Sequence, residues 1–411
     1  MIGNTFGRLF RITACGESYG ICKGSGLAVI VDGVPPGMQI DLKHVQAELD
    51  KRRPGQSKLD SPRKETDRVA LFSGVLEGRT TGAPVGLIIY NVDTQDFHVD
   101  QYRQVKHLIR PGHAEYTFFV KYGEHADWCG AGRASGRETV GRVASGAVAK
   151  QILAREGIEI LAHIVESHKI KARPLSFEEV AANYRKNHLN CCDLDVAAAM
   201  TQDIMEIRKS GDTCGGVIEI IARGVPAGLG EPVFDKLKAT LAHAILSIGA
   251  VTGLEIGAGF DASWMTGSEW NDLPYVDDAG HVRFRTNRSG GLLGGISNGE
   301  EIRLRAAVKP TPTIDIEQDS VDMTTITPSK LAAVTRRDAS LLPRVYPVCE
   351  AMTAVALLDA MMIAKGTEHF ARLDAKWHQQ AEPRWRIAHD EIIQRSFRQP
   401  QALGEEAGPL E

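Results

Sequence analysis

Short runs of apolar residues, each bounded by glycine, proline or aspartate, predict strands along most of the chain. The predicted strands cover residues 27–32, 85–90, 159–166, 216–222, 253–258 and 302–308. Apolar residues at helical spacing predict amphipathic helices elsewhere. The predicted helices cover residues 42–52, 139–155, 232–248 and 347–364. Because strands and helices do not alternate regularly, the order favours an α+β fold, with a core of antiparallel β-sheets and helices packed outside, over a doubly wound fold.

The pattern changes near residue 370. Residues 370–411 are charged and aromatic, with few aliphatic side chains. Such a segment buries little apolar surface, so we expect a helical extension with a frayed tail. The length of 411 residues allows one large domain or two.

Composition and charge exclude several classes of function. A net charge of −4 argues against nonspecific nucleic-acid binding, so the arginine clusters indicate a small anionic ligand. No apolar run approaches membrane-spanning length and the N-terminus lacks the apolar core of a signal peptide, which predicts a cytoplasmic protein without a membrane partner. The seven cysteines are odd in number and show no C-x-x-C pairing. This usage fits reduced thiols better than disulfides or zinc, and we expect no metal site.

A glycine-rich stretch at residues 288–314 is the first candidate for chemistry. It places five glycines within ten residues and then Lys309, in the sequence RSGGLLGGISNGEEIRLRAAVKPTPTI. Glycines allow positive φ and close approach of the backbone to a phosphate or a flavin. The simpler alternative is a glycine-rich hairpin that carries a surface lysine.

A second glycine-rich loop, residues 130–136 (GAGRASG), precedes the predicted helix 139–155. Its third glycine falls one residue late for the G-x-G-x-x-G pattern, so it does not predict a dinucleotide site. A loop of glycine and arginine that leads into a helix N-terminus instead predicts an anion site, because exposed N–H groups and the helix dipole favour negative charge there.

Four polar segments have both a structural and a functional interpretation. Residues 16–20 (GESYG) form either a turn or part of a site, and residues 52–67 form either a solvated charged face or an anion clamp. Residues 110–113 (RPGH) offer a surface histidine or a general acid. Residues 335–338 (TRRD) fit an ordinary ion pair.

Taken together, these segments resemble the chorismate synthase family. The matching stretches, in the family's order over residues 1–365, are GESYG, VDGVPPG, RRPGQS with SPRKETD, SGVLEGRTTGAPVG, RPGHAEYTFFVKYG, GAGRASGRETVGRVASGA, GGLLGGISNG, KPTPTI and TRRD with PRVYPVCEAM. The resemblance implies an FMN-dependent homotetramer in which residues 1–369 form one domain, with helices outside antiparallel sheets. It also implies an anti-1,4-elimination of phosphate from 5-enolpyruvylshikimate 3-phosphate to give chorismate.

The implied substrate carries a phosphate and two carboxylates, which arginines bind well. We therefore predict substrate contacts at Arg52, Arg53, Arg110 and Arg137, and the resemblance adds Lys58 beside Arg52. By the same resemblance, reduced FMN (FMNH2) is the cofactor. The implied flavin contacts are Arg133, Ala134, Ser135, Gly249, Ala250, Gly294, Lys309, Pro310, Thr311, Pro312, Thr313 and Arg336.

The resemblance also implies catalytic roles. Asp338 matches the family aspartate that assists proton transfer beside the flavin, and His113 matches the histidine that protonates the reduced flavin. Ser18 and Ser135 match two active-site serines that relay hydrogen bonds. Reduced FMN is required although the reaction has no net redox change. No flavin-reductase domain is evident in the sequence, so we expect an external reductase or reductant.

Several positions depart from the family pattern. Tyr19 stands where the family has a histidine, and a tyrosine donates a hydrogen bond but carries no positive charge at neutral pH. Lys23 lies in a longer loop after it, and Arg337 replaces the histidine beside Asp338. Ala134 replaces a serine and Gly249 an asparagine, and the segment after Asn91 lacks an arginine.

These departures leave three hypotheses. The first is a chorismate synthase in which Lys23 and Arg337 compensate for the lost histidine. The second is a paralogue, a reduced-flavin-dependent lyase on a related cyclohexene acid. The third, a flavin-binding protein without catalysis, agrees least with the retained His113 and Asp338.

Overall fold

The structure is a computed structural model that describes residues 3–19, 25–57, 59, 65–92, 96–334 and 337–380. Lys23, Lys58 and Arg336 lie outside the described residues. The chain divides into two compact units, residues 1–361 and 362–411. The first unit holds both large sheets and the candidate site residues. The predicted boundary at residue 369 stays a prediction.

The first sheet is five-stranded and antiparallel. Its order is β1 (Thr5–Phe6), β2 (Arg11–Gly16), β3 (Gly26–Asp32), β7 (Val85–Tyr90) and β4 (Val69–Ser73). β3 pairs with β7 so that Val29 lies opposite Leu87. Every second residue of β3 is buried, as expected for a strand with one face against the core.

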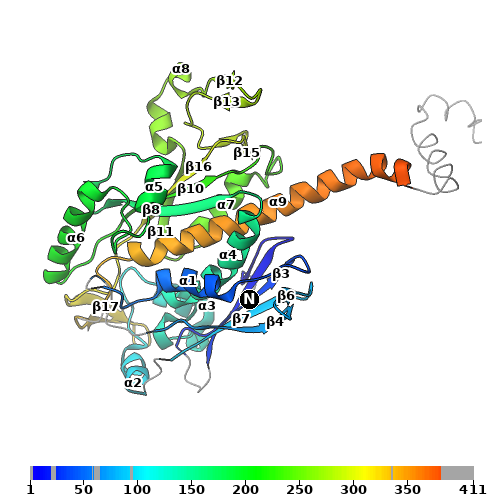
Figure 1. Cartoon of the computed structure of the whole chain (residues 1–411). Coiled ribbons are helices and arrows are strands. Elements are labelled where there is room, and N and C mark those ends of the chain that lie inside the picture. Colours follow the sequence, from blue (N-terminus) through cyan, green and yellow to red (C-terminus); the bar gives the residue numbers. More distant parts are fainter. Residues whose placement is uncertain are drawn as a thin grey trace, which may run out of the picture. The chain divides into compact units, whose positions relative to one another are not determined.

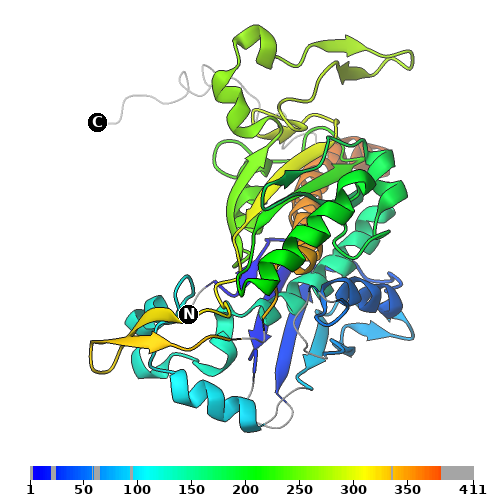
Figure 2. The ribbon, with the colours of Figure 1, turned by 90° about the vertical axis from the view of Figure 1, so that its left-hand side faces the viewer.

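The second sheet is also five-stranded and antiparallel, in the order β11 (Val251–Ile256), β16 (Ile302–Val308), β10 (Gly216–Arg223), β8 (Glu159–Ser167) and β9 (Ile170–Lys171). Small hairpins pair β5 (Val75–Leu76) with β6 (Arg79–Thr80), β12 (Pro274–Val276) with β13 (Val282–Phe284), β14 (Leu292–Leu293) with β15 (Ile296–Ser297), and β17 (Gln318–Asp322) with β18 (Thr327–Leu331). Figure 2 shows the β12–β13 hairpin projecting beyond the second sheet.

The α-helices are α1 (Leu42–Arg52), α2 (Asp96–Val105), α3 (Glu115–Tyr122), α4 (Thr139–Ala154), α5 (Phe177–Asn183), α6 (Leu194–Lys209), α7 (Leu237–Leu246), α8 (Gly267–Trp270) and α9 (Leu342–Gln380). Short 3-10 helices are η1 (Gly123–His125), η2 (Cys129–Ala134), η3 (Gly136–Glu138) and η4 (Gly259–Trp264). The four predicted helices and six predicted strands are all present. The helix predicted from residue 232 begins only at Leu237, because Lys236 before it has ψ 138, which is outside the helical range.

α4 lies between the two sheets and contacts β2, β3 and β7 of the first and β8 of the second. Its sequence is rich in alanine, valine and glycine, which lets neighbouring backbones approach closely. At the crossing with α9, a Cβ on Gly146 would overlap Ala351, and Figure 1 shows the first half of α9 running beside α4. The predicted α+β class with antiparallel sheets is confirmed, with α4 inside the sandwich rather than outside it.

The segment Leu342–Gly366 of α9 meets the length and composition of a membrane span, which differs from the expectation that no apolar run approaches that length. Its apolar window is 78% buried inside the protein, so packing in the core accounts for its composition. The six described cysteines are free thiols. Among the described residues, no group of three or more histidine, cysteine or acidic side chains is arranged to hold a metal ion.

Candidate functional site

A cavity lined by Asp338, Arg110, Thr311 and Thr313 brings together three motifs that are far apart in the sequence. We call it the Asp338 cavity. Its walls also include Tyr102, Lys106, Glu115, Trp128, Arg337 and Arg344. A neighbouring cavity, the His113 cavity, is lined by His113, Phe118, Phe119 and Met323, and it shares Lys106, Glu115 and Trp128 with the first. The predicted residues Asp338 and His113 thus line adjoining spaces.

Glu115 holds the RPGH turn together. It forms an ion pair with Arg110, which also donates from Nε at 3.0 Å, and its Oε2 lies 3.1 Å from Nδ1 of His113. Burial alone would raise the pKa of Glu115, but the hydrogen bond with His113 and the charge of Arg110 lower it to about 2. Glu115 is therefore ionised at neutral pH, and it orients both predicted site residues.

The Lys309–Thr313 segment packs against the same turn. Lys309 Nζ donates to the carbonyl of Gly112 at 2.5 Å, and Arg110 Nη1 donates to Thr313 Oγ1 at 3.3 Å. Lys309 also donates its backbone N–H to the carbonyl of Ala250 at 3.0 Å. The structure thus brings the predicted phosphate-binding turn and part of the second predicted flavin loop beside the predicted acid.

Asp338 is buried and anchored by Arg344, whose Nη1 donates to Oδ2 at 2.6 Å. Arg344 lies in the first turn of α9, so the buried helix fixes the position of the carboxylate. Arg337 is also buried. It forms an ion pair with Asp315 at 3.4 Å and donates to the carbonyl of Arg208 at 3.0 Å. Its charge is therefore already engaged by protein groups.

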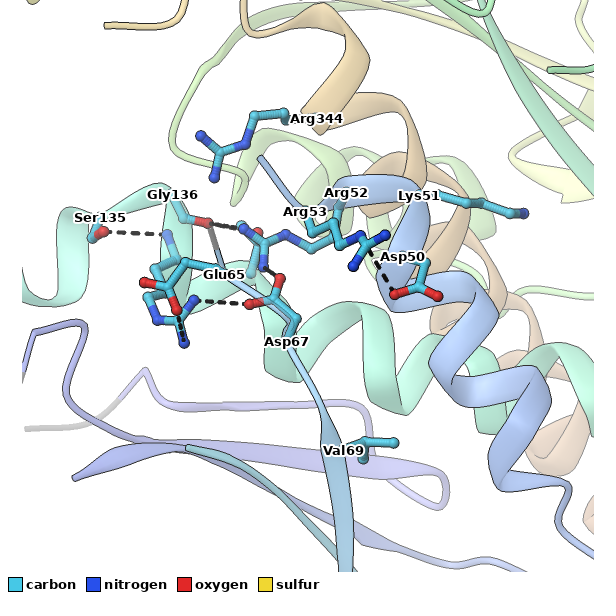
Figure 3. A network of polar contacts seen from close by, with 12 residues as sticks. Asp50, Lys51, Arg52, Arg53, Glu65, Asp67, Val69, Ser135, Gly136 and Arg344 are labelled. Atoms are coloured by element: carbon cyan, nitrogen blue, oxygen red, sulfur yellow. Dashed lines mark hydrogen bonds and ion pairs between the residues drawn. The ribbon is translucent and has the colours of Figure 1, made fainter. Parts of the chain in front are cut away.

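Arg52 and Arg137 form a buried ion-pair network on Asp67. Figure 3 shows Arg52 pointing toward Asp67, with Glu65 nearby. Arg52 donates to Asp67 Oδ2 at 2.7 Å and Arg137 donates to Oδ1 at 2.8 Å. Arg137 also pairs with Glu65 at 3.2 Å. Only 1% of Arg52 and 5% of Arg137 is exposed.

The pKa values follow from that geometry. Burial lowers the pKa of Arg52 to about 10, although Asp67 opposes the shift. Burial would raise the pKa of Asp67, but Arg52 and Arg137 hold it below its usual value. A direct contact between either arginine and a substrate would have to exchange these bonds, which is costly for a buried pair.

Ser18 and Tyr19 are buried and are not among the residues that line the Asp338 cavity. Tyr19 is 6% exposed, and its ring meets Tyr102 edge-to-face at 5.6 Å. Gly130 makes this packing possible, since it has φ +63 and a Cβ there would lie 2.9 Å from Cβ of Tyr19. Tyr102 separates Tyr19 from the Asp338 cavity.

The second glycine loop has a structural role in this chain. Ser135 accepts a hydrogen bond from the backbone N–H of Arg137 at 3.2 Å and so caps the short helix η3. Arg133 binds Asn4 at 2.9 Å and the carbonyl of Ala14 at 3.2 Å, which fastens the loop to β2. Ala134 ends η2 between them.

The predicted flavin contacts are not all in one place. Gly249 follows the end of α7, whereas Gly294 lies in the β14–β15 turn, next to Gly295, which faces Lys236 at the start of α7. α7 has ten residues, so its two ends lie about 15 Å apart at the usual rise per residue of an α-helix. Gly249 and Gly294 therefore lie at opposite ends of this helix.

Arg53 lines a different cavity from Arg110. This third space, the Arg185 cavity, is lined by Lys51, Arg53, Arg185, Lys186, His188 and Arg344, together with Gln56, Asn187, Pro343 and Tyr346. Arg53 is 40% exposed at its side chain, and its Nε lies 3.7 Å from Asp50. The predicted cluster at residues 52–58 is thus divided, because Arg52 points into the buried network and Arg53 points to this cavity.

Sequence reasoning missed Glu115, Arg344 and Asp67. Glu115 follows His113 by two residues, and this acid–histidine spacing was an available signal. Arg344 lies within the recognised PRVYP stretch, but its pairing with Asp338 depends on where α9 begins. Asp67 stood at the end of the charged segment, with nothing in the sequence to select it over Asp60.

Comparison with known proteins gives one consistent result. The family model for chorismate synthase matches residues 10–362. A chorismate synthase of Acetivibrio thermocellus is 56% identical over 391 residues, covering 92% of this chain and 99% of that protein. A chorismate synthase of Methanosarcina barkeri is 48% identical over 362 residues, covering 88% and 97%. A crystal structure of chorismate synthase aligns with a TM-score of 0.67 at 28% identity, covering 87% and 93%.

Proposed function

Because the chain belongs to the chorismate synthase family of lyases, we propose that it catalyses the anti-1,4-elimination of phosphate from 5-enolpyruvylshikimate 3-phosphate to give chorismate. The Asp338 cavity carries the proposal, because a carboxylate, Arg110 and the Thr311–Thr313 turn line one space. The reaction breaks the carbon–oxygen bond to phosphate and removes a proton from carbon 6. It therefore needs anion-binding groups close to a proton acceptor.

In this proposal Arg110 binds the anionic substrate directly. Its side chain lines the cavity and is held by Glu115 and Thr313, so little conformational freedom is lost on binding. Arg52 and Arg137 act from behind the wall through their buried bonds with Asp67. Arg53 and Lys58 remain candidates for the approach of the substrate.

Two groups handle protons. Arg344 fixes Oδ2 of Asp338, which holds the carboxylate at the cavity wall, where it accepts or passes on the proton. Glu115 fixes His113 through Nδ1, which assigns proton exchange to Nε2. Tyr19 packs behind Tyr102 of the cavity wall and Ser135 caps η3 beside Arg137, whereas the relay role of Ser18 stays a prediction.

The residues of the Lys309–Thr313 turn fit a flavin phosphate. Thr311 Oγ1 is buried and has no hydrogen-bond partner among the described residues, as expected for a group that meets a ligand. Lys309 supplies a cation beside it, and Ala250 accepts a hydrogen bond from the backbone of Lys309. The other flavin contacts implied by the family, at Arg133, Ala134, Ser135, Gly249, Gly294 and Arg336, stay predictions. When bound, reduced FMN supplies transient electron density while phosphate leaves, without net redox change. In the proposal an external reductase supplies the reduced flavin and the protein is a homotetramer.

An anaerobic assay tests the function. The full chain is mixed with chemically reduced FMN and 5-enolpyruvylshikimate 3-phosphate, and chorismate is followed by its absorbance. We expect chorismate and phosphate in equal amounts, with no product when FMN stays oxidised. Binding of FMN without chorismate formation would reject the proposed reaction and favour a changed substrate. The absence of FMN binding, with or without substrate, would reject the flavin site.

A further inference from the structure

The Arg185 cavity is strongly basic. It shares with the proposed function only Arg344, which holds Asp338, and Arg53, a candidate for the approach of the substrate. It is bounded by the end of α1, the turn after α5 and the first turn of α9. Its volume is about 200 Å³, enough for a small oxyanion and several waters at about 30 Å³ each. None of the described residues that line it is acidic. The lining therefore favours an anion.

Part of this positive charge is not neutralised by the protein. Lys51 pairs with Glu48 at 2.8 Å, and Arg344 pairs with Asp338. Arg53, by contrast, has only the long 3.7 Å contact with Asp50, and its buried Nε has no hydrogen-bond partner in the described structure. Within the described part of the chain, neither Arg185 nor Lys186 forms an ion pair with an acidic side chain. Three cations are thus available to a ligand.

The turn that carries Arg185 is held rigidly. Arg185 has φ +59, a left-handed conformation that a non-glycine residue rarely adopts unless the surrounding structure holds it there. Its N–H donates to Asn190 Oδ1 at 2.7 Å, and Asn190 donates to the carbonyl of Ala162 at 2.9 Å. Asn187 donates to the carbonyl of Cys191 at 2.6 Å. These bonds to a buried strand present Arg185 in a fixed position, which lowers the entropic cost of binding.

We propose that the Arg185 cavity is a second anion site, which binds a phosphate dianion beside the catalytic cavity. Tetrahedral oxyanions with two charges suit a pocket of guanidinium, ammonium and amide donors. The inference rests on the proposed function, because the reaction releases phosphate next to this pocket. A phosphorylated metabolite from solution presents the same group.

Arg344 connects the two cavities. It lines both of them and donates to Asp338 at 2.6 Å. An anion in the Arg185 cavity draws on the same guanidinium that positions the catalytic carboxylate. Bound phosphate therefore slows turnover without competing with the substrate, in addition to any competition inside the Asp338 cavity.

Isothermal titration calorimetry of the full chain with inorganic phosphate, in a buffer that contains no phosphate, tests the site. The test variant is Arg185→Gln with Lys186→Gln, and the matched control is Lys169→Gln with Lys238→Gln, which removes two exposed charges elsewhere. Arg110→Gln is introduced into all proteins, so that binding in the Asp338 cavity contributes less heat. We expect the test variant to bind phosphate more weakly by about tenfold or more, since charged hydrogen bonds are lost. The control should match its parent.

Equal phosphate affinity in the test variant and the control would overturn the inference. Lys186→Gln alone leaves the Arg185 turn unchanged and should show a smaller loss of the same sign, which excludes misfolding as the cause. Glycerol 3-phosphate is titrated in parallel. Tighter binding of inorganic phosphate identifies the released product as the ligand, and tighter binding of the ester identifies a phosphorylated metabolite.

Turnover separates this inference from the proposed function. Suppose that the wild type forms no chorismate. The second site is still supported if the Arg110→Gln protein binds phosphate and the added Arg185 and Lys186 changes weaken that binding. Suppose instead that the wild type forms chorismate. If phosphate inhibits it purely competitively, and the Arg185 and Lys186 variant is inhibited equally, the second site is rejected while the proposed function stands. We expect a noncompetitive component that the variant loses.

Discussion

Arg344 holds Asp338 at the wall of its cavity by donating from Nη1 to Oδ2 at 2.6 Å. The pairing joins a loop residue to the first turn of a buried helix, so the carboxylate is positioned by the core rather than by its own loop. The proton transfer proposed for Asp338 needs such a fixed carboxylate, because a transferring group must lie within hydrogen-bond reach of the proton.

Replacing Asp338 by asparagine tests its role at the scale of one residue. The amide keeps the size of the side chain and its contact with Arg344 but cannot accept the proton. We expect kcat to fall by about 10²-fold or more, with a smaller change in FMN affinity. The measurement is anaerobic turnover with supplied reduced flavin, beside Asp278→Asn in an exposed turn as the control. Full turnover of the Asp338 variant would remove this residue from the mechanism.

At the scale of elements, α1, α4 and α9 are joined by a buried charge network. Lys150 of α4 pairs with Glu48 of α1 at 2.9 Å and with Glu350 of α9 at 2.5 Å, and Glu350 also accepts from Tyr184. Burial would raise the pKa of Glu48, but Lys150 and Lys51 lower it to about 2. The network therefore depends on ionised carboxylates.

Acid should weaken this helix contact in a defined window. A carboxylate whose pKa is lower in the folded protein contributes stability above its unfolded pKa of 4.5, and this is lost as pH falls toward 2. The contribution of Glu48 is at most about 3 kcal/mol at neutral pH. Urea unfolding at several pH values should show the free energy of unfolding falling below pH 4.5. Glu48→Gln should flatten that dependence, and an unchanged slope in the variant would contradict it.

The crossing of α4 and α9 depends on the missing side chain of Gly146. A Cβ at this position overlaps the backbone and side chain of Ala351. Gly146→Ala should therefore destabilise the protein by about 1–3 kcal/mol or more through overpacking, although alanine is favoured over glycine in a helix by about 1 kcal/mol. Gly267→Ala in α8 is the control, since nothing lies within 4 Å of its Cβ. Thermal unfolding of both variants measures the difference, and a stabilised Gly146 variant would refute the close crossing.

At the scale of the whole molecule, the compact unit of residues 1–361 agrees with a family match that ends at residue 362. We predict that a chain ending at residue 369 keeps its turnover within about twofold and a similar unfolding temperature, because the buried core of the described residues extends only to Met361. A chain ending at residue 355 loses Leu357 and Leu358, which are buried, and should fail to fold. Loss of activity in the chain that ends at residue 369 would assign a function to residues 370–411.

The sequence by itself determined the elements whose pattern is strong. β3, β16 and α4 lie where periodicity predicted them, since alternation and helical spacing directly reflect burial of one face. The family was also determined, because its motifs hold their order along nearly the whole chain. α2 and α3 were not predicted, because they are short and their apolar positions are mixed with polar ones.

Only the tertiary structure decided which charged residues face a cavity. Arg52 and Arg53 are adjacent in the sequence, yet one is buried on Asp67 and the other lines the Arg185 cavity. The sequence carries no signal for this difference, because α1 ends between them and Arg53 takes an extended conformation. The same holds for Arg344 and Asp338, whose ion pair exists because the folded core brings the start of α9 against the preceding loop. The residue types can be read from the sequence, whereas the partner and direction of each side chain depended on how the elements pack in the folded core.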